Sequence, residues 1–288
     1  MRKENNMSVK IIVDSTADLN ESVRDRFAVV PLSIYFGEEE YVDGITITHH
    51  QFYEKLIESD VLPTTSQAAP SAFMKVFDEV LEPDDSAVVI TISSKLSGTC
   101  QSALIAAAEY SNVYVVDGNS AAIGTGILAE YALRLVDEGK TAEEIARILD
   151  AKKKDICLIA MLDTLEYLKK GGRISKTVAF AGGVLNIKPV VNIEDGEIHI
   201  LGKARGSKQG NNLLIQEIRK AGGIDFTMPI LLGYTGLTDV LLKKYIQDSS
   251  ALWENGTDTL NYTTVGSVVG THTGPGVIAA AFFKKTNT

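Results

Sequence analysis

Residues 86–99 read SAVVITISSKLSGT and join an apolar strand pattern to a helical pattern through a turn rich in hydroxyl side chains. The first seven residues are mostly β-branched and do not alternate with polar ones, which is typical of a strand in a parallel sheet covered on both faces. From Gly98 onward, apolar residues recur at the i, i+3, i+4 and i+7 spacing of a helix. The stretch therefore predicts a strand, a turn and a helix, with Ser97 as the residue that caps the helix.

This turn has two interpretations. A helix N-terminus offers unpaired backbone N–H groups and the positive end of the helix dipole, and neighbouring serines add hydroxyl donors, so a carboxylate or phosphate is favoured there. Alternatively, Ser97 or Thr99 only caps the helix, as hydroxyl residues commonly do. Residues 86–99 alone leave both interpretations open.

Composition limits the class of protein. A chain of 288 residues can form two domains or one large α/β domain, and its 45% hydrophobic content excludes general disorder. The net charge is −9 and no basic block or aromatic-basic stripe is present, so we expect no nucleic-acid partner. The apolar runs fall short of the ~20 residues that span a bilayer, and residues 1–10 lack the apolar core of a signal peptide. We expect no integral membrane segment and a cytoplasmic protein.

Strand patterns alternate with helical patterns in the first half of the chain, which favours a parallel, doubly wound sheet. In the second half, the turn residues at 194–196 separate two strand patterns and predict an antiparallel hairpin. Thr48 with Gln51, and Thr141 with Glu144, fit the capping box that begins a helix. The patterns predict strands at 9–13, 29–36, 86–92, 113–116, 156–162, 188–193, 197–201, 229–234 and 262–269, and helices at 49–59, 71–81, 98–107, 142–154, 163–170, 211–221 and 238–248.

Polar residues gather in four segments that we interpret as turns. Three of them, Asp14–Asp18, Thr64–Gln67 and Ser93–Thr99, are placed at strand ends, and the fourth is a glycine-rich turn that carries His272. Because ligands of parallel α/β sheets lie beyond the carboxyl ends of the strands, we expect these segments to converge. Hydroxyl groups, a helix end and a histidine together suit one small anion.

The same residues include the parts of a serine nucleophile and its base, so a serine hydrolase or acyltransferase that uses Ser97 and His272 is an alternative. Ser97 lies in Leu-Ser-Gly rather than in a G-x-S-x-G elbow, and no acid is obviously placed to orient His272.

No cofactor or metal is expected. The segment Gly124–Ala129 loosely matches a dinucleotide fingerprint, but its first glycine comes eight residues after the predicted strand ends, where that motif needs an immediate turn. We interpret these glycines as positions of close helix packing. His49 and His50 are adjacent on a predicted helix, so they point in different directions and make a poor metal pair.

Six segments, taken in order, resemble the signatures of the DegV family, and the resemblance covers essentially the whole chain. They are Val13–Leu19, Thr64–Gln67, Ile92–Gln101, Leu165–Ile174, Lys203–Gly206 and His272–Gly276. The resemblance implies an N-terminal α/β/α domain with a parallel sheet and a C-terminal α/β domain with a mixed sheet, with the ligand between them. The sequence places the join near Asp155, which gives domains at 7–155 and 156–288.

The resemblance also implies a function. DegV proteins bind a long-chain fatty acid, and the well-understood members are the fatty-acid-binding subunit of bacterial fatty acid kinase. A separate subunit, related to dihydroxyacetone kinases, phosphorylates the bound carboxylate to an acyl phosphate. Such a protein has no catalytic residue of its own, which agrees with the lack of a G-x-x-x-x-G-K-[ST] loop or a kinase signature in this sequence. A regulator that senses lipid is a further alternative.

Site residues follow from the matching motifs. Thr65, Ser97 and His272 are implied as the polar partners of the fatty-acid carboxylate, and Arg173 and Arg205 as the residues that work with the kinase, both on exposed turns. An apolar segment, 177–187, is either ordinary core or a wall for the hydrocarbon chain. The residues expected next to the carboxylate site are Asp14, Ser15, Ser66, Ser94, Gly98 and Thr99.

Overall fold

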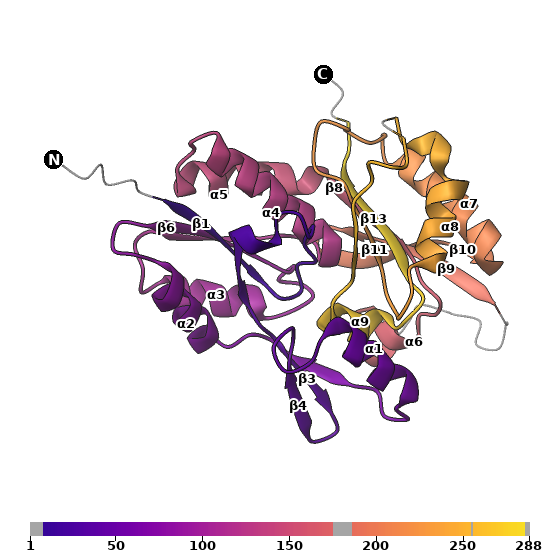
Figure 1. The fold of residues 1–288 in the computed structure, drawn as a ribbon, viewed down its shortest axis with the longest axis horizontal. Coiled ribbons are helices and arrows are strands. Elements are labelled where there is room, and N and C mark those ends of the chain that lie inside the picture. Colours follow the sequence, from indigo (N-terminus) through magenta and orange to yellow (C-terminus); the bar gives the residue numbers. More distant parts are fainter. Residues whose placement is uncertain (1–7, 175–185, 255, 286–288) are drawn as a thin grey trace.

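The computed structural model describes residues 8–174, 186–254 and 256–285, which form a mixed α/β fold around three β-sheets (Figure 1). The N-terminal part contains a parallel sheet and the C-terminal part contains a mixed sheet, so the predicted fold class is confirmed. The division into domains at residues 155 and 156 stays a prediction. None of the helices within these ranges has the length and apolar content that crossing a bilayer requires.

The parallel sheet has the strand order β2-β1-β6-β7, and helices cover both of its faces. In β1, Ile12 packs into one core, whereas Ile11 and Val13 pack into the other. Burial on both faces explains why these strands show no alternation of apolar and polar residues. The elements are β1 (Val9–Asp14), β2 (Phe27–Val30), β6 (Ser86–Thr91) and β7 (Val113–Asp117), with α2 (Pro70–Val80) and α3 (Thr99–Ala107) on one face and α4 (Ala122–Asp137) and α5 (Ala142–Lys152) on the other.

The mixed sheet has the strand order β10-β9-β8-β13-β11-β12. Helix α4 packs on one face of this sheet and also on the parallel sheet, so it lies between the two (Figure 1). The other face is covered by α7 (Gly206–Lys220) and α8 (Val240–Asp248). The strands are β8 (Ile156–Met161), β9 (Ile187–Glu194), β10 (Glu197–Arg205), β11 (Leu231–Tyr234), β12 (Tyr262–Thr264) and β13 (Ile278–Phe283).

The predicted hairpin is confirmed. Strands β9 and β10 are antiparallel, with Glu194 opposite Glu197. The two residues between them, Asp195 and Gly196, both have positive φ (49° and 81°), as the tightest hairpin turns require. The capping boxes are confirmed as well: Thr48 begins α1 (His49–Glu58), and Thr141 begins α5.

A third, three-stranded antiparallel sheet was not predicted. Its strands are β4 (Glu39–Val42), β3 (Ser33–Phe36) and β5 (Thr64–Ser66), in that order. The prediction of one strand at 29–36 is therefore wrong, because the chain leaves the parallel sheet after β2 and enters the small sheet as β3. Pro31 lies between the two strands, and it has no N–H group to donate to a sheet. The segment Thr64–Gln67 is likewise an edge strand rather than a turn after a parallel strand.

The region around His272 also differs from the prediction. The strand predicted at 262–269 ends at Thr264, and α9 (Ser267–Thr273) follows, so His272 lies in a helix and not in a glycine-rich turn. A side-chain hydrogen bond accompanies the change, because Oδ1 of Asp18 accepts a hydrogen bond from the N–H of the N-cap residue Gly266 at 2.7 Å. The last strand, β13, was not predicted, because its three alanines carry a weak strand signal.

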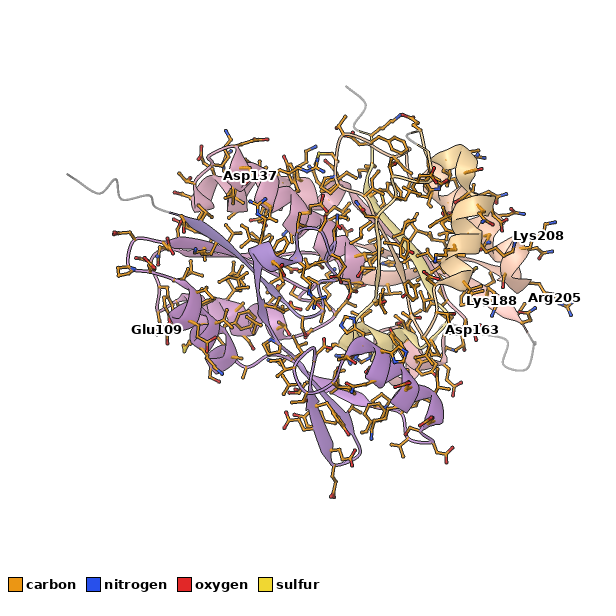
Figure 2. All side chains as sticks on the ribbon, in the orientation of Figure 1. Glu109, Asp137, Asp163, Lys188, Arg205 and Lys208 are labelled. Carbon is orange, nitrogen blue, oxygen red and sulfur yellow. The ribbon has the colours of Figure 1, made fainter. Side chains whose placement is uncertain are left out.

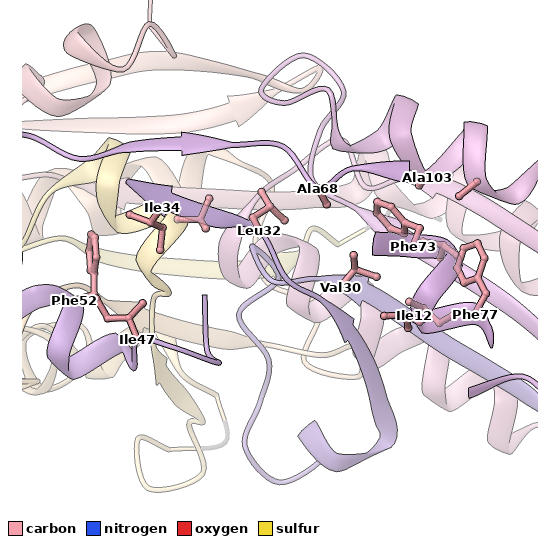
Figure 3. Packing of buried hydrophobic residues seen from close by; sticks show 14 of the residues in the cluster. Ile12, Val30, Leu32, Ile34, Ile47, Phe52, Ala68, Phe73, Phe77 and Ala103 are labelled. Carbon is pink, nitrogen blue, oxygen red and sulfur yellow. The ribbon is translucent and has the colours of Figure 1, made fainter. Parts of the chain in front are cut away.

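One hydrophobic core joins the parallel sheet to the small sheet (Figure 3). It contains Ile12 and Phe73 from the layers of the parallel sheet and Ile34 and Phe52 from the small sheet and α1. This continuous core fixes the small sheet, and with it β5, against the rest of the protein. The remaining short helices are α6 (Glu166–Lys170) and the 3-10 turns Arg24–Arg26, Lys153–Asp155 and Ser250–Leu252. The apolar segment 177–187, interpreted as either ordinary core or a wall for a hydrocarbon chain, lies outside the described residues except for its last two.

Candidate functional site

A cavity lies where the small sheet, α9 and the loop after β6 meet. We call it the polar cavity because hydroxyl groups, a histidine and an arginine line it together with apolar side chains. Its empty volume is about 520 Å³, including its open mouth. Thr65, Ser97 and His272 all line it, so the structure brings together residues from three distant segments that the sequence analysis expected to converge. The other lining residues are Thr16, Leu32, Ser66, Gln67, Ile92, Leu96, Ala121, Leu168, Arg173, Ile198, Val268, Val269 and Thr273.

Thr65 and His272 are hydrogen-bonded to each other. The distance between Thr65 Oγ1 and His272 Nε2 is 2.9 Å. Strand β5 holds Thr65 through its pairing with Ile34 of β3, and the last turn of α9 holds His272. The imidazole packs directly on Gly171, where any side chain would overlap Nδ1. The other ring nitrogen, Nδ1, is buried and has no hydrogen-bond partner among the residues that the structure describes.

The imidazole of His272 is neutral at neutral pH. Burial, together with the positive charge of Arg173, lowers the pKa of His272 to about 4 from its ordinary value of 6.5. A neutral imidazole has one N–H donor and one acceptor nitrogen. His272 therefore acts in this cavity as a hydrogen-bonding group and not as a charge.

Ser97 does not contact His272 in this structure. Its Oγ lies 2.9 Å from Thr99 Oγ1 and accepts a hydrogen bond from the Thr99 backbone N–H at 3.3 Å. The predicted cap is displaced by one residue, because α3 begins at Thr99 with Gly98 as its N-cap. Ser97 Oγ nevertheless accepts a hydrogen bond from the N–H of Thr99, the first residue of α3. It therefore still satisfies one of the free donors at the helix end. This arrangement supplies neither a base for Ser97 nor an acid partner for His272.

Arg173 borders the polar cavity and is not on a fully exposed turn as predicted. Its side chain is half-buried, and burial lowers the pKa of the guanidinium below its usual range. The guanidinium donates hydrogen bonds to the carbonyl oxygens of Leu96, at 3.2 Å, and Gly171, at 2.7 Å. Arg173 also lines a wide, open groove that adjoins the polar cavity at Leu96 and Ile198. Its charge therefore lies at the mouth of the site.

Arg205 lies apart from this cavity. It is exposed at the end of β10 and caps α7, as predicted for a residue on the surface. Figure 2 shows it at the outer edge of the molecule next to Lys208. Arg205 does not line the polar cavity.

The residues expected next to the site divide into two groups. Ser66 lines the polar cavity, Thr99 is buried beneath Ser97, and Gly98 lies so close to Gln67 that a side chain would overlap its amide. Asp14, Ser15 and Ser94 do not line the cavity. Each of the three takes part in a hydrogen bond that involves a backbone N–H group: Asp14 accepts from Ile92, Ser15 accepts from Leu32, and the N–H of Ser94 donates to Asp117.

Asp14 connects two of the loops that form the cavity. It is fully buried, and its carboxylate accepts hydrogen bonds from the Thr16 N–H at 2.9 Å, the Thr16 hydroxyl at 2.5 Å and the Ile92 N–H at 2.7 Å. Burial raises the pKa of Asp14 above 3.8, against the opposing effect of these bonds. Asp14 thus positions Thr16, a cavity residue that sequence analysis missed although it belongs to the same motif.

An apolar cavity adjoins the polar one and was also missed. Its empty volume is about 560 Å³, and the two cavities share Ala121, Leu168, Ile198, Val269 and Thr273. Among the residues that the structure describes, no charged one lines it. The periodicity of these strands signals burial but does not distinguish a filled core from a cavity, so no sequence signal was available. Its other lining residues are Ala122, Leu158, Ala160, Leu162, Val191, Asn192, Ile193, Thr235, Val265, Val277 and Ala279.

The site therefore combines a polar compartment with an apolar one. Hydroxyl donors, a neutral histidine and an arginine suit a small anion, whereas the adjoining compartment suits a hydrocarbon. Within the described part of the chain, no cluster of three or more histidine, cysteine, aspartate or glutamate side chains is arranged to hold a metal ion. Chemically, the arrangement favours binding of an amphipathic molecule.

Comparison with known proteins gives related sequences and folds. A family model described as "Uncharacterised protein, DegV family" matches residues 8–285. A DegV domain-containing protein of Caldanaerobacter subterraneus is 34% identical over 283 residues, which cover 96% of this chain and 99% of the relative.

Two solved structures show the same fold. One is described as fatty acid binding of a DegV family protein from Thermus thermophilus; it has a TM-score of 0.85 and 32% identity and covers 97% of this chain and 100% of its own. The other is described as a stearic acid-binding protein from Eubacterium ventriosum; it has a TM-score of 0.84 and 27% identity and covers 96% of this chain and 98% of its own.

Proposed function

This chain belongs to the DegV family, and on that basis we propose that it binds a long-chain fatty acid. The carboxylate lies in the polar cavity and the hydrocarbon chain in the apolar cavity. The observation that carries the proposal is the direct connection between a cavity that holds hydroxyl groups, a histidine and an arginine and a second cavity lined almost wholly by apolar side chains. The related proteins of T. thermophilus and E. ventriosum, which are described as binding fatty acids, support it.

A hydrogen bond from His272 orients the Thr65 hydroxyl so that it can donate its own proton to a carboxylate. The Thr65 hydroxyl has one proton, and it can donate that proton to the ligand only when it accepts a hydrogen bond from His272 Nε2–H. The proton of the neutral imidazole then resides on Nε2, and Nδ1 is left as the acceptor without a partner. Ser97 supplies a second hydroxyl, and Arg173 a positive charge near the mouth.

The apolar cavity supplies most of the affinity. Each methylene group transferred from water to an apolar site contributes about 0.8 kcal/mol. The carboxylate loses hydration when it enters the protein, and this cost is offset only where donors are already in place. In this proposal the polar cavity orients the ligand, and the hydrocarbon holds it.

We further propose that the protein has no catalytic residue of its own and presents its ligand to a separate kinase subunit in the cytoplasm. The dihydroxyacetone-kinase-like partner would phosphorylate the carboxylate to an acyl phosphate. Arg173, at the border of the polar cavity and the open groove, is suited to a phosphoryl group that approaches from outside. The absence of a contact between Ser97 and His272 favours this carrier role over ester hydrolysis.

Native mass spectrometry tests the binding proposal. Protein purified from bacteria, or incubated with stearic acid, is expected to carry one added mass that matches a fatty acid. Release of that mass by organic extraction identifies the ligand. A protein that retains no fatty acid and accepts neither palmitic nor stearic acid would contradict the proposed function.

Replacing Arg205 separates ligand binding from the kinase step. Arg205→Ala is expected to leave stearic acid affinity unchanged, because Arg205 does not line the cavity. We expect it to slow acyl-phosphate formation by the cognate kinase about tenfold, which corresponds to about 1.4 kcal/mol, because arginine is enriched among the residues that dominate interfaces. Formation of acyl phosphate from radiolabelled ATP measures the rate. Lys208→Ala is the matched control, since it removes a neighbouring charge from the same edge (Figure 2). Equal rates for the wild type and Arg205→Ala would exclude a role of Arg205 at the interface.

A further inference from the structure

One peptide bond at the start of α9 is held from both sides. The N–H of Gly266 donates a hydrogen bond to Asp18 Oδ1 at 2.7 Å. The carbonyl oxygen of Val265 accepts a hydrogen bond from the Tyr53 hydroxyl at 2.8 Å. These two backbone groups belong to the same trans peptide bond, in which they point in opposite directions. We call it the clamped peptide, because Asp18 and Tyr53 hold it between them.

Both side chains come from segments remote in sequence, and both are buried. Tyr53 lies in α1, and Asp18 lies in the loop after β1. Burial raises the pKa of the Asp18 carboxyl and of the Tyr53 phenol well above their ordinary values. Hydrogen bonds in such a place meet little competition from water, and loss of either one leaves a buried backbone group without a partner. The two bonds therefore constrain the clamped peptide strongly.

Helix α9 depends on such constraints for its position. It has seven residues, fewer than an isolated helix needs to be stable in water. It packs closely on α1, since a Cβ at Gly270 would overlap the Tyr53 hydroxyl. At Gly266, a Cβ would lie only 3.1 Å from His49 Nε2 and 3.2 Å from Asp18 Oδ1. The clamped peptide thus fixes the end of α9 at which it approaches α1 most closely.

His272 lies at the other end of the same helix. It follows Gly266 by six residues, which corresponds to about 9 Å along a helix axis. Thr65 is held independently, through the pairing of β5 with β3. The 2.9 Å distance between Thr65 Oγ1 and His272 Nε2 therefore depends on where α9 lies. A displacement of less than about 1 Å takes the two atoms beyond hydrogen-bond distance.

We propose that Asp18 and Tyr53 are positioning residues of the carboxylate site. By holding the clamped peptide they set the place of His272, and through His272 they orient the Thr65 hydroxyl. Neither Asp18 nor Tyr53 lines the polar cavity, so neither contacts the ligand. The inference rests on the proposed function, because it assigns the groups that prepare the same site.

The test compares two ligands with the same hydrocarbon chain and different head groups. Dissociation constants of stearic acid and stearyl alcohol are measured by displacement of a fluorescent fatty acid from the full-length protein. Their ratio gives the preference for the carboxylate, since the contribution of the hydrocarbon is common to both. Asp18→Ala is expected to lower this preference about tenfold, as misplacement of a hydrogen bond to a charged group does. Tyr53→Phe, which removes only the hydroxyl, is expected to lower it as well.

Two control variants separate positioning from general stability. Asp18→Asn keeps an acceptor oxygen for the Gly266 N–H, and its amide nitrogen replaces Oδ2, which has no partner among the described residues. Its preference should stay within about twofold of the wild type. Asp85→Ala removes another buried aspartate that accepts a backbone N–H, from Ser8 at 3.2 Å, but it lines neither cavity. It should change the two affinities together and leave their ratio unchanged.

A double variant tests whether Asp18 acts through Thr65. In a Thr65→Val background, Asp18→Ala should change the preference by less than about twofold, because two substitutions that remove one interaction are not additive. A tenfold loss in both backgrounds, or an equal loss in Asp18→Asn and Asp18→Ala, would overturn the inference.

The remaining outcomes are equally decisive. Where Asp18→Ala does not fold, Tyr53→Phe carries the same test from the other side of the clamped peptide. Folded variants that keep the wild-type preference, or that weaken acid and alcohol equally, would overturn this inference and leave the proposed function intact. A wild type that binds no fatty acid would overturn both.

Discussion

Replacing Thr65 with valine is expected to lower the affinity for stearic acid about ten- to a hundredfold. Valine keeps the shape of threonine but removes the hydroxyl that would donate to the carboxylate, and it leaves His272 Nε2 without its partner at 2.9 Å. A hydrogen bond to a charged group is worth about 1.5–3 kcal/mol, and an unpaired buried polar atom adds to the loss. Isothermal titration calorimetry with the delipidated protein measures the change.

The control for this variant is Thr64→Val. It makes the same chemical change one position away in β5, where the side chain is exposed and does not line the polar cavity. Its affinity should match that of the wild type. If Thr65→Val and Thr64→Val bind stearic acid equally well, Thr65 does not hold the carboxylate, and the position of the ligand head in this proposal is wrong.

The second large effect is expected in the pH dependence of stability. His272 has a pKa of about 4 in the folded protein and about 6.5 in the unfolded chain. Between these values the unfolded chain binds a proton that the folded protein does not, so the free energy of unfolding decreases as the pH falls from about 6.5 to about 4. The full loss from this residue is about 3 kcal/mol, since each unit of pKa difference corresponds to about 1.4 kcal/mol. Above pH 6.5 the contribution is constant.

Comparison of the wild type with His272→Gln isolates this contribution. Glutamine retains an amide donor toward Thr65 but does not titrate, so its free energy of unfolding should decline less than that of the wild type over the same range. Buried carboxyls with raised pKa values, such as Asp14 and Asp18, act in the opposite direction, but they are present in both proteins and cancel in the difference. Urea denaturation of ligand-free protein at pH 7, 5.5 and 4.5 gives the values. Parallel curves for the two proteins would refute a neutral, buried His272.

Local sequence signals were sufficient to predict those elements whose opposite faces are buried to the same degree. The unalternated strands β1, β6 and β7, the two capping boxes and the β9–β10 hairpin follow directly from residue types and spacing. Gly124 and Gly126 were interpreted as positions of close packing. A side chain at Gly126 would overlap the backbone carbonyl of Asp18, which agrees with that interpretation.

Other elements depended on contacts that the local sequence does not contain. The chain from Val265 to Val269 is rich in valine and favours a strand, yet part of it forms α9, whose N-cap is bonded to Asp18, far away in sequence. Likewise, the strand pattern at 29–36 gives no sign that its two halves join different sheets. A pattern of apolar residues indicates that a segment is buried, but it does not indicate which other elements that segment packs against.

The turn at residues 93–99 illustrates which features the sequence alone determines and which depend on the tertiary structure. By itself, the sequence determined that an apolar strand leads through serines into a helix, because strand and helix periodicity and capping are properties of neighbouring residues. It also provided the motifs that place the chain in the DegV family.

Only the tertiary structure decided which groups meet at that turn. Thr65 and His272 are separated by 207 positions in the chain, and their contact exists because the small sheet and α9 pack together. Ser97 is hydrogen-bonded to Thr99 rather than to His272. Hydrogen bonds from Arg173 to two backbone carbonyl oxygens hold its side chain at the mouth of the cavity. The apolar cavity likewise forms between side chains of β8, β13 and the start of α4, which are far apart in the sequence. Distances between residues remote in sequence are set by the packing of whole elements, which no local pattern encodes.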